Sequence, residues 1–147
     1  MIWSCKKFDA LSPDELYAIL QLRAEVFVVE QDCVFLDADN RDQDAHHVMG
    51  FEENKLMAYS RILRPGISYV ESSIGRVVTS PKVRNRGVGK ILMEKSIEAL
   101  YSLYGNIPIR IGAQYYLKDF YASFGFKSTG DIYLEDGIQH IIMLLEK

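Results

Sequence analysis

Cysteine is scarce in this sequence, and long apolar runs are absent. The 147 residues include two cysteines, Cys5 and Cys33, whereas a disulfide scaffold is cysteine-dense. Neither belongs to a CxxC or histidine-linked metal motif, so we interpret both as buried or inactive thiols.

No apolar run approaches the ~20 residues that span a bilayer. Lys6 and Lys7 follow rather than precede the first apolar residues, unlike the charges of a signal peptide. We expect a cytoplasmic protein with no membrane partner.

Positive charge is also in short supply. The chain has 17 Lys and Arg residues against 20 Asp and Glu residues, a formal charge of −3 at pH 7. A nucleic-acid-binding domain would be expected to carry a basic surface, so we expect no nucleic-acid partner. A chain of this length buries roughly 68–70% of its unfolded surface, and no repeat or linker divides the sequence. We therefore expect a single domain spanning residues 1–147, as a monomer or a homodimer.

Apolar periodicity predicts a mixed α/β fold of the α+β type. We expect helices at residues 12–29, 87–103 and 116–124, and strands at residues 2–8, 46–52, 56–63, 73–80 and 107–113, followed by a final hairpin. Ser12, Pro13 and Glu15 are typical of a helix start, and Asp136-Gly137 is a strong signal for a type I′ hairpin turn. Antiparallel strands followed by a strand–helix–strand crossover imply a mixed, mostly antiparallel sheet flanked by helices.

A glycine-containing segment joins the fourth predicted strand to the second predicted helix. Its sequence, at residues 84–89, is Arg-Asn-Arg-Gly-Val-Gly. A helix N-terminus favours an anion because its amides are free and its dipole is positive, and glycine lets the backbone approach a ligand. A P-loop would need glycine at Arg84, and a dinucleotide fingerprint would need glycine at Leu92. The segment is therefore another kind of phosphate-binding loop or, alternatively, a solvated basic turn.

Two motifs resemble those of the GNAT superfamily of N-acyltransferases. Residues 84–89 resemble the R-x-x-G-x-G loop that holds the coenzyme A pyrophosphate in that family, and residues 120–126 resemble its F-Y-x-x-x-G-F segment. The order of predicted elements along nearly the whole chain is also that of the GNAT fold. Four further segments resemble the ElaA-like branch of this superfamily, which is assigned as acetyltransferases. They are residues 20–23, 26–31, 58–63 and 137–141.

The resemblance implies an acetyl-CoA-dependent N-acetyltransferase that acts on a primary amine of a small molecule or peptide. In this family the amine attacks the thioester directly, so no enzyme nucleophile is required. The alternative is a catalytically silent acyl-CoA-binding or interaction module, which keeps the loop but has no acceptor chemistry.

The resemblance also implies where acetyl-CoA binds as co-substrate. The pantetheine arm is expected along the edge of the fourth strand, where a splay from the next strand leaves backbone groups unpaired, at Val77, Val78 and Thr79. The pyrophosphate is expected at Arg84, Asn85, Arg86, Gly87, Val88, Gly89 and Lys90. No metal is expected, because the acidic stretch from Asp37 lacks the glycine and the final acid of a calcium loop.

Tyr121 stands at the family position of the general acid. A tyrosine with an ordinary pKa of ~10 can protonate a leaving thiolate whose ordinary pKa is near 8.5. No carboxylate lies between residues 72 and 80 to act as a base on the fourth strand, so the base candidates are Glu30, His47 and His140, with Glu71 just before that strand. Histidine has the most suitable ordinary pKa. The structural alternatives are helix packing for Tyr121 and a core or rim position for each histidine.

Two arginines interrupt predicted strands that are otherwise mainly apolar. Arg61 and Arg76 must each meet a carboxylate or an anionic ligand, because an unpaired charge in a half-buried sheet is costly. We favour salt bridges to Glu30 or to an aspartate of the 37–44 loop. The alternative is that both arginines bind the substrate, through a carboxylate of an amino-acid-like or peptide acceptor.

Overall fold

Two antiparallel sheets form the frame of the computed structural model, which describes residues 1–146. The first sheet has the order β1 (Ile2–Lys7), β2 (His46–Glu52), β3 (Lys55–Leu63) and β4 (Ser73–Thr79). In the second sheet the central β8 (Ile138–Leu145) pairs with β5 (Ile109–Gln114), β6 (Lys127–Ser128) and β7 (Tyr133–Glu135). All of these strand pairs are antiparallel, which confirms the predicted fold class.

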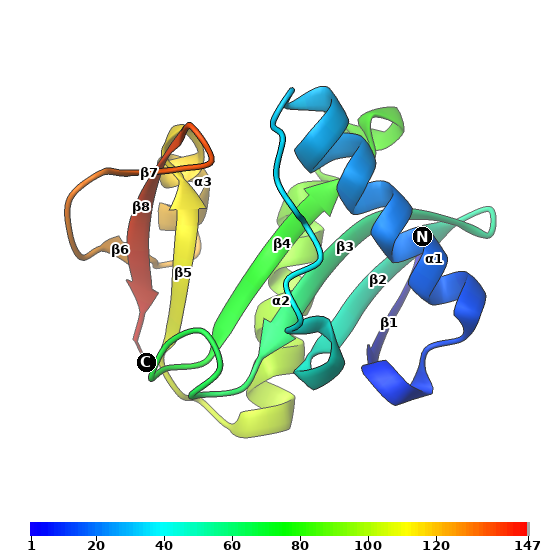
Figure 1. The fold of residues 1–147 in the computed structure, drawn as a ribbon. Helices are drawn as coiled ribbons and strands as arrows, with labels where there is room; N and C mark the ends of the chain where they lie inside the picture. Colours follow the sequence, from blue (N-terminus) through cyan, green and yellow to red (C-terminus); the bar gives the residue numbers. More distant parts are fainter. Residues whose placement is uncertain (147) are drawn as a thin grey trace.

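The two sheets meet at the start of β4 and β5. Ser72 and Ile109 form an isolated parallel bridge, and the Arg110 amide donates a hydrogen bond to the Ser72 carbonyl at 2.9 Å. Beyond this contact the two strands diverge (Figure 1). The edge of β4 that faces β5 is therefore left without a strand partner over the described part of the chain.

Helices cover both sheets. α1 (Pro13–Arg23) and α2 (Val88–Tyr104) lie on opposite faces of the first sheet, and α3 (Lys118–Ala122) lies against the second (Figure 1). The predicted start of α1 is confirmed, because Ser12 Oγ accepts a hydrogen bond from the Glu15 amide at 3.0 Å and the Glu15 carboxylate accepts one from the Ser12 amide at 2.8 Å. Short 3₁₀ turns lie at Phe8–Ala10, Asp42–Asp44, Pro81–Val83 and Tyr115–Leu117.

The helix expected at residues 12–29 changes its pitch after Arg23. Ala24–Glu30 form a π-helical segment, in which Val26 is buried. A π turn closes one residue later than an α turn, so the spacing of apolar residues does not reveal the change. Segments of this kind are frequent at functional sites, and this one ends with Glu30 at the cleft described below.

Two hairpin turns use the left-handed region of the backbone. Asp136 and Gly137 have φ angles of 51° and 78° and connect β7 to β8, which confirms the predicted type I′ turn. Glu53 and Asn54, with φ angles of 52° and 63°, connect β2 to β3 in the same way.

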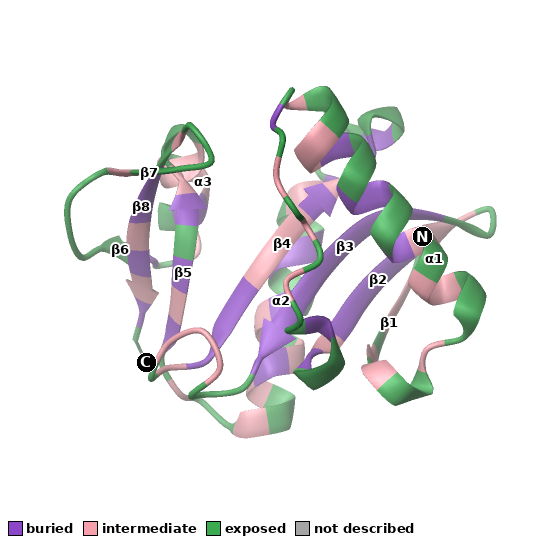
Figure 2. Cartoon of the chain, viewed as in Figure 1, coloured by how far each residue is buried: buried purple, intermediate pink, exposed green. Residues whose placement is uncertain are grey.

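The hydrophobic core lies on both faces of the first sheet. One cluster fills the space between α2 and the two sheets, where Leu92 and Ile109 are fully buried. A second cluster joins α1 to the sheet through Ile19 and Met49, which are also fully buried. Figure 2 shows that β2 and β3 are buried along most of their length, whereas the exposed face of α1 points to solvent.

No helix within residues 1–146 is both long and apolar enough to cross a membrane. The two cysteines are free thiols, with Cys33 buried and Cys5 exposed.

Candidate active site

A cleft of about 960 Å³ lies where β4 and β5 diverge. Its walls come from the π-helical segment and the loop after it, from β4, from the start of α2, from β5 with α3, and from the β7–β8 hairpin. Val77, Val78 and Thr79, the predicted pantetheine positions, all line this cleft, as do Tyr121 and His140. The fold therefore brings most of the predicted site residues to one cavity.

A bulge in β4 shapes one wall of the cleft. The register between β3 and β4 shifts between the pairs Tyr59–Val78 and Arg61–Gly75, so β4 has one extra residue there. Arg76, in the bulge, has a φ angle of 50°. A bulge bends its strand and redirects side chains, and this one turns Arg76 and the following residues of β4 toward the cleft.

The loop before α2 has the geometry of an anion site. Asn85 and Gly87 have φ angles of 65° and 73°, and α2 begins at Val88. The first amides of a helix lack intrahelical partners, and they carry the positive end of the helix dipole. A Cβ at Gly87 would meet no atom within 4 Å, so there is room for a ligand. The loop therefore leaves room for an anionic ligand, and the predicted place of the pyrophosphate stays a prediction.

The loop's two arginines already have carboxylate partners. Arg84 donates to both carboxylate oxygens of Glu30 at 2.6 and 2.5 Å, and Arg86 donates to Glu52 at 3.1 and 2.8 Å. Both pairs are largely exposed, and exposed ion pairs contribute little to stability. A phosphate can therefore replace either carboxylate. Lys90 is exposed at the start of α2.

Tyr121 lies on α3 with its side chain in the cleft wall and is 7% exposed. Its ring packs edge-to-face against Phe120 and Phe126, with centroids 5.2 and 6.1 Å away. Burial raises the pKa of Tyr121 well above its usual range. Within residues 1–146 no protein group forms a hydrogen bond with its hydroxyl. The hydroxyl is thus a protonated donor free to bind a ligand.

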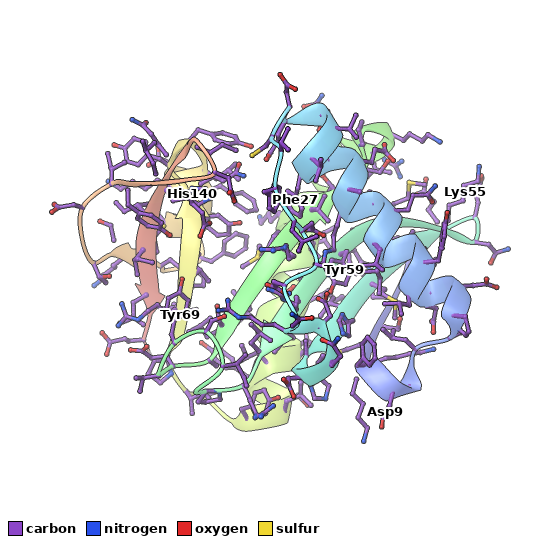
Figure 3. The ribbon with its side chains drawn as sticks, in the orientation of Figure 1. Asp9, Phe27, Lys55, Tyr59, Tyr69 and His140 are labelled. Carbon is purple, nitrogen blue, oxygen red and sulfur yellow. The ribbon has the colours of Figure 1, made fainter. Side chains whose placement is uncertain are left out.

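His140 lies on β8 and faces the same cleft (Figure 3). Its Nδ1 is 2.8 Å from the Ile138 carbonyl. Because a carbonyl only accepts, Nδ1 must carry the proton, and the neutral ring then has a lone pair on Nε2. Nε2 lies 3.5 Å from a carboxylate oxygen of Glu135. When the ring is neutral, Nε2 and this carboxylate oxygen are two neighbouring acceptors at the cleft.

The other base candidates are placed less favourably. Glu30 lines the cleft, but its hydrogen bonds with Arg84 lower the pKa of its carboxyl. His47 is fully buried between the Tyr59 hydroxyl at 2.6 Å and a backbone carbonyl, and it does not line the cleft. Glu71 pairs with Arg110 at 2.8 Å, also away from the cleft. The choice of His47 as a base candidate is therefore wrong, because the register of β2 points its side chain into the interior.

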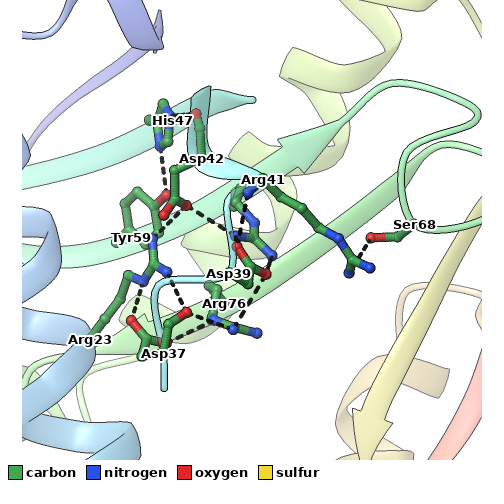
Figure 4. A network of polar contacts seen from close by, with 10 residues as sticks. Arg23, Asp37, Asp39, Arg41, Asp42, His47, Tyr59, Ser68 and Arg76 are labelled. Atoms are coloured by element: carbon green, nitrogen blue, oxygen red, sulfur yellow. Dashed lines mark hydrogen bonds and ion pairs between the residues drawn. The ribbon is translucent and has the colours of Figure 1, made fainter. Parts of the chain in front are cut away.

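A buried network of ion pairs lies behind the cleft (Figure 4). Arg61, 3% exposed, donates to Asp39 at 2.7 and 2.8 Å and to Asp42 at 3.0 Å. Arg76 donates to Asp37 at 2.8 Å. The favoured salt bridges to the 37–44 loop are confirmed. Arg61 does not line the cleft, so its assignment to substrate is wrong, whereas Arg76 remains on the wall.

Arg23, which was not predicted as a site residue, completes this network. Its side chain is fully buried and pairs with Asp37 at 2.8 Å and with Asp42 at 2.7 Å. A signal was present, because Arg23 follows Ile19 at the i+4 spacing of the buried helix face. Within residues 1–146 no group of three or more His, Cys, Asp or Glu side chains is placed to hold a metal. The carboxylates of Asp37, Asp39 and Asp42 therefore neutralise the buried arginines.

Comparisons with known proteins agree with this geometry. A family model described as an acetyltransferase (GNAT) domain matches residues 11–147. The chain is 42% identical to protein ElaA of Escherichia coli over 146 residues, which are 98% of this chain and 95% of that protein. The crystal structure of E. coli ElaA has a TM-score of 0.93 at 41% identity and covers 99% of both chains.

Two further solved structures share the fold. An acyl-CoA N-acyltransferase from Pseudomonas aeruginosa has a TM-score of 0.94 at 42% identity, covering 98% of both chains. An aminoglycoside 6′-N-acetyltransferase complexed with coenzyme A has a TM-score of 0.70 at 16% identity, covering 98% of this chain and 96% of that one. At that identity the likeness concerns the fold alone.

Proposed function

Because the chain belongs to the GNAT acetyltransferase family, we propose that it transfers the acetyl group of acetyl-CoA to a primary amine of a small molecule or peptide. The amine attacks directly in a ternary complex. The observation that carries this proposal is the shared cleft, which joins an unpaired strand edge and the start of α2 to a free tyrosine hydroxyl and a histidine. A module that only bound acyl-CoA would need neither the tyrosine hydroxyl nor the histidine.

The residues that would hold acetyl-CoA follow from the geometry of the wall. The amides at the start of α2 suit the pyrophosphate, and Arg84, Arg86 and Lys90 add positive charge beside it. The unpaired edge of β4 at residues 77–79 offers hydrogen bonds to the amides of the pantetheine arm. When bound, acetyl-CoA supplies an activated acyl group. An amide near Val78 is proposed to stabilise negative charge on the carbonyl oxygen during attack.

Tyr121 is proposed as the general acid. Its hydroxyl has no protein partner among the described residues, and its raised pKa keeps it protonated at neutral pH. In this role it donates its proton to the departing sulfur and is reprotonated from solvent.

His140 is proposed as the general base. An amine acceptor arrives as an ammonium, which is a donor, and the Nε2 lone pair and the Glu135 carboxylate offer two acceptors 3.5 Å apart. The ammonium can donate to both of them and pass one proton to Nε2. The resulting imidazolium is stabilised by the adjacent carboxylate and by the Ile138 carbonyl that receives its Nδ1 proton.

His140→Gln is expected to lower kcat/KM for the amine by about 100-fold at pH 7, within the usual range for general base catalysis. The deficit should shrink as the pH approaches ~10, because free amine then forms without assistance. Binding of acetyl-CoA, followed by thermal shift, should not change. The matched control is His46→Gln, which lies outside the cleft. An equal deficit at every pH would show that His140 is not the base.

Gly87→Glu is expected to weaken coenzyme A binding by at least about 100-fold. The substitution places a carboxylate in the open space beside the first amides of α2, and opposing like charges costs several kcal/mol. Calorimetric titration with coenzyme A measures the loss. The matched control is Gly105→Glu, because Gly105 also has a positive φ, of 85°, and open space but lies at the other end of α2. Unchanged affinity in Gly87→Glu would refute this placement of the pyrophosphate.

Thiol release tests the proposed activity itself. The protein is first screened for thermal stabilisation by acetyl-CoA and coenzyme A, and release of coenzyme A is then measured over a panel of primary amines. Stabilisation together with amine-dependent release supports the acetyltransferase. Stabilisation without release on any amine favours the silent binding module, and no stabilisation would contradict both.

A further inference from the structure

Within residues 1–146, Arg41 is the one arginine that no carboxylate neutralises. Each of the other seven has a carboxylate oxygen within 4 Å, namely Arg23, Arg61, Arg64, Arg76, Arg84, Arg86 and Arg110. Arg41 Nη1 donates to the hydroxyl of Ser68 at 3.1 Å, and Arg41 lines the cleft. The wall thus contains a positive charge whose partner is a neutral hydroxyl.

The buried network fixes the position of Arg41. Asn40 has a φ of 64°, and the Arg41 amide donates to Asp39 Oδ1 at 3.2 Å. Asp39 is itself held by Arg61 through both of its oxygens. Figure 4 shows that the Arg41 side chain extends away from the aspartates, toward Ser68. The loop therefore anchors the backbone of Arg41 and leaves its guanidinium available.

Two tyrosine hydroxyls lie close to Gly112 in the cleft wall, although neither tyrosine is itself a lining residue. A Cβ at Gly112, which lines the cleft, would lie 2.8 Å from the Tyr133 hydroxyl and 3.2 Å from the Tyr69 hydroxyl. Tyr69 follows Ser68 in the chain. Burial and the charge of Glu135 raise the pKa of Tyr69, and the charges of Arg110 and Arg41 act in the opposite direction. The Tyr133 ring packs against His140 in a tilted arrangement, with centroids 5.7 Å apart. The Arg41 guanidinium and the hydroxyls of Tyr69 and Tyr133 are thus hydrogen-bond donors in the part of the protein that also contains His140, the proposed base.

We propose that Arg41, with the hydroxyls of Tyr69 and Tyr133, binds a carboxylate of the acceptor, so that the acceptors are amines that also carry a carboxylate. Free amino acids and peptides with a free C-terminus share this chemistry. The cleft complements such a molecule at both ends, because Glu135 and His140 accept from the ammonium and Arg41 donates to the carboxylate. This inference rests on the proposed acetyltransferase activity and names its substrate class.

Matched pairs of amines with and without the carboxylate test the inference. The pairs are L-lysine and cadaverine, L-phenylalanine and phenethylamine, and alanylalanine and its C-terminal amide. Thiol release with acetyl-CoA gives kcat/KM for each. The carboxylate-bearing member of an accepted pair should be favoured by roughly 10- to 100-fold, the usual value of a hydrogen bond to a charged group. Comparing lysine with alanylalanine distinguishes a free amino acid from a peptide C-terminus.

Arg41→Gln should remove most of this preference, mainly through a higher KM for the carboxylate-bearing member. KM for acetyl-CoA and turnover of the decarboxylated member should stay unchanged. Arg41→Lys, which keeps the charge but loses the planar fork, should restore part of the preference. Arg64→Gln removes the same charge outside the cleft and serves as the control.

Three results would overturn the inference. Equal kcat/KM for both members of every accepted pair would refute it and leave the acetyltransferase activity standing. A preference that survives Arg41→Gln would refute the assignment to Arg41. Stabilisation by acetyl-CoA with no thiol release on any amine would refute the proposed function and this inference together.

Discussion

Tyr121→Phe is expected to lower kcat at neutral pH by at least about 100-fold, because general acid catalysis contributes roughly 10²–10⁴-fold. The substitution removes one oxygen atom and keeps the ring that packs against Phe120 and Phe126. Since the hydroxyl has no hydrogen-bond partner within residues 1–146, its removal leaves no protein group unsatisfied. Stability and acetyl-CoA affinity should therefore be almost unchanged while turnover, measured by thiol release, falls.

Tyr17→Phe is the matched control for this substitution. Tyr17 lies on α1, is 71% exposed and does not line the cleft, so loss of its hydroxyl should leave kcat unaltered. The pH profile gives a second test. Burial raises the pKa of Tyr121 well above its usual range, so kcat of the unmodified protein should not decline up to pH ~10. Unchanged turnover in Tyr121→Phe would identify a different acid.

The loop proposed to hold the coenzyme A pyrophosphate could be located from the sequence because consecutive residues form it. Residues 84–89 contain the glycines, two arginines and the helix start in one stretch, and a glycine at position 87 allows the left-handed backbone found there. The engagement of Arg84 by Glu30 and of Arg86 by Glu52 was not predictable. Those partners lie 54 and 34 residues away, so tertiary structure decides the pairing.

The acceptor side could be predicted only as a set of candidates. His47 and His140 are both strand histidines with similar local sequence signals, yet the first is fully buried in the interior and the second faces the cleft. Strand register decides which face a residue occupies, since a shift of one residue reverses it. Arg41, in a polar loop, carried no signal at all, because its role depends on the absence of a carboxylate near its guanidinium.

The fold was predicted best where turns have specific chemistry. Asp136-Gly137 demands a type I′ turn and forms one, and Ser12 with Glu15 forms the expected capping box. The bulge at Arg76 was not predicted. The extra residue of the bulge is defined by the pairing of β4 with β3, which lies elsewhere in the chain. Arginine also rarely adopts a positive φ, so nothing local predicts this conformation.

Asp42→Ala is expected to lower the free energy of unfolding by roughly 3–5 kcal/mol, as removal of one partner from a buried ion pair does. Asp42 Oδ1 accepts from Arg23 at 2.7 Å and from Arg61 at 3.0 Å. Both guanidinium groups are almost fully buried, so water cannot form the hydrogen bonds that the Asp42 carboxylate provided. Chemical denaturation at pH 7 measures the change. A matched control is Glu52→Ala, whose exposed pair with Arg86 should make a much smaller difference.

The effect of Asp42→Ala should depend on pH with a definite sign. Burial alone would raise the pKa of Asp42, but hydrogen bonds and charge from Arg23 and Arg61 outweigh it and lower the pKa. A carboxyl whose pKa is lower in the folded state stabilises the protein fully above its unfolded pKa of ~3.9 and loses that contribution as the pH falls through the folded value. The difference between the unmodified protein and Asp42→Ala should therefore narrow below pH ~4. A difference that stays constant down to pH ~2 would contradict the ionised state of Asp42 in this network.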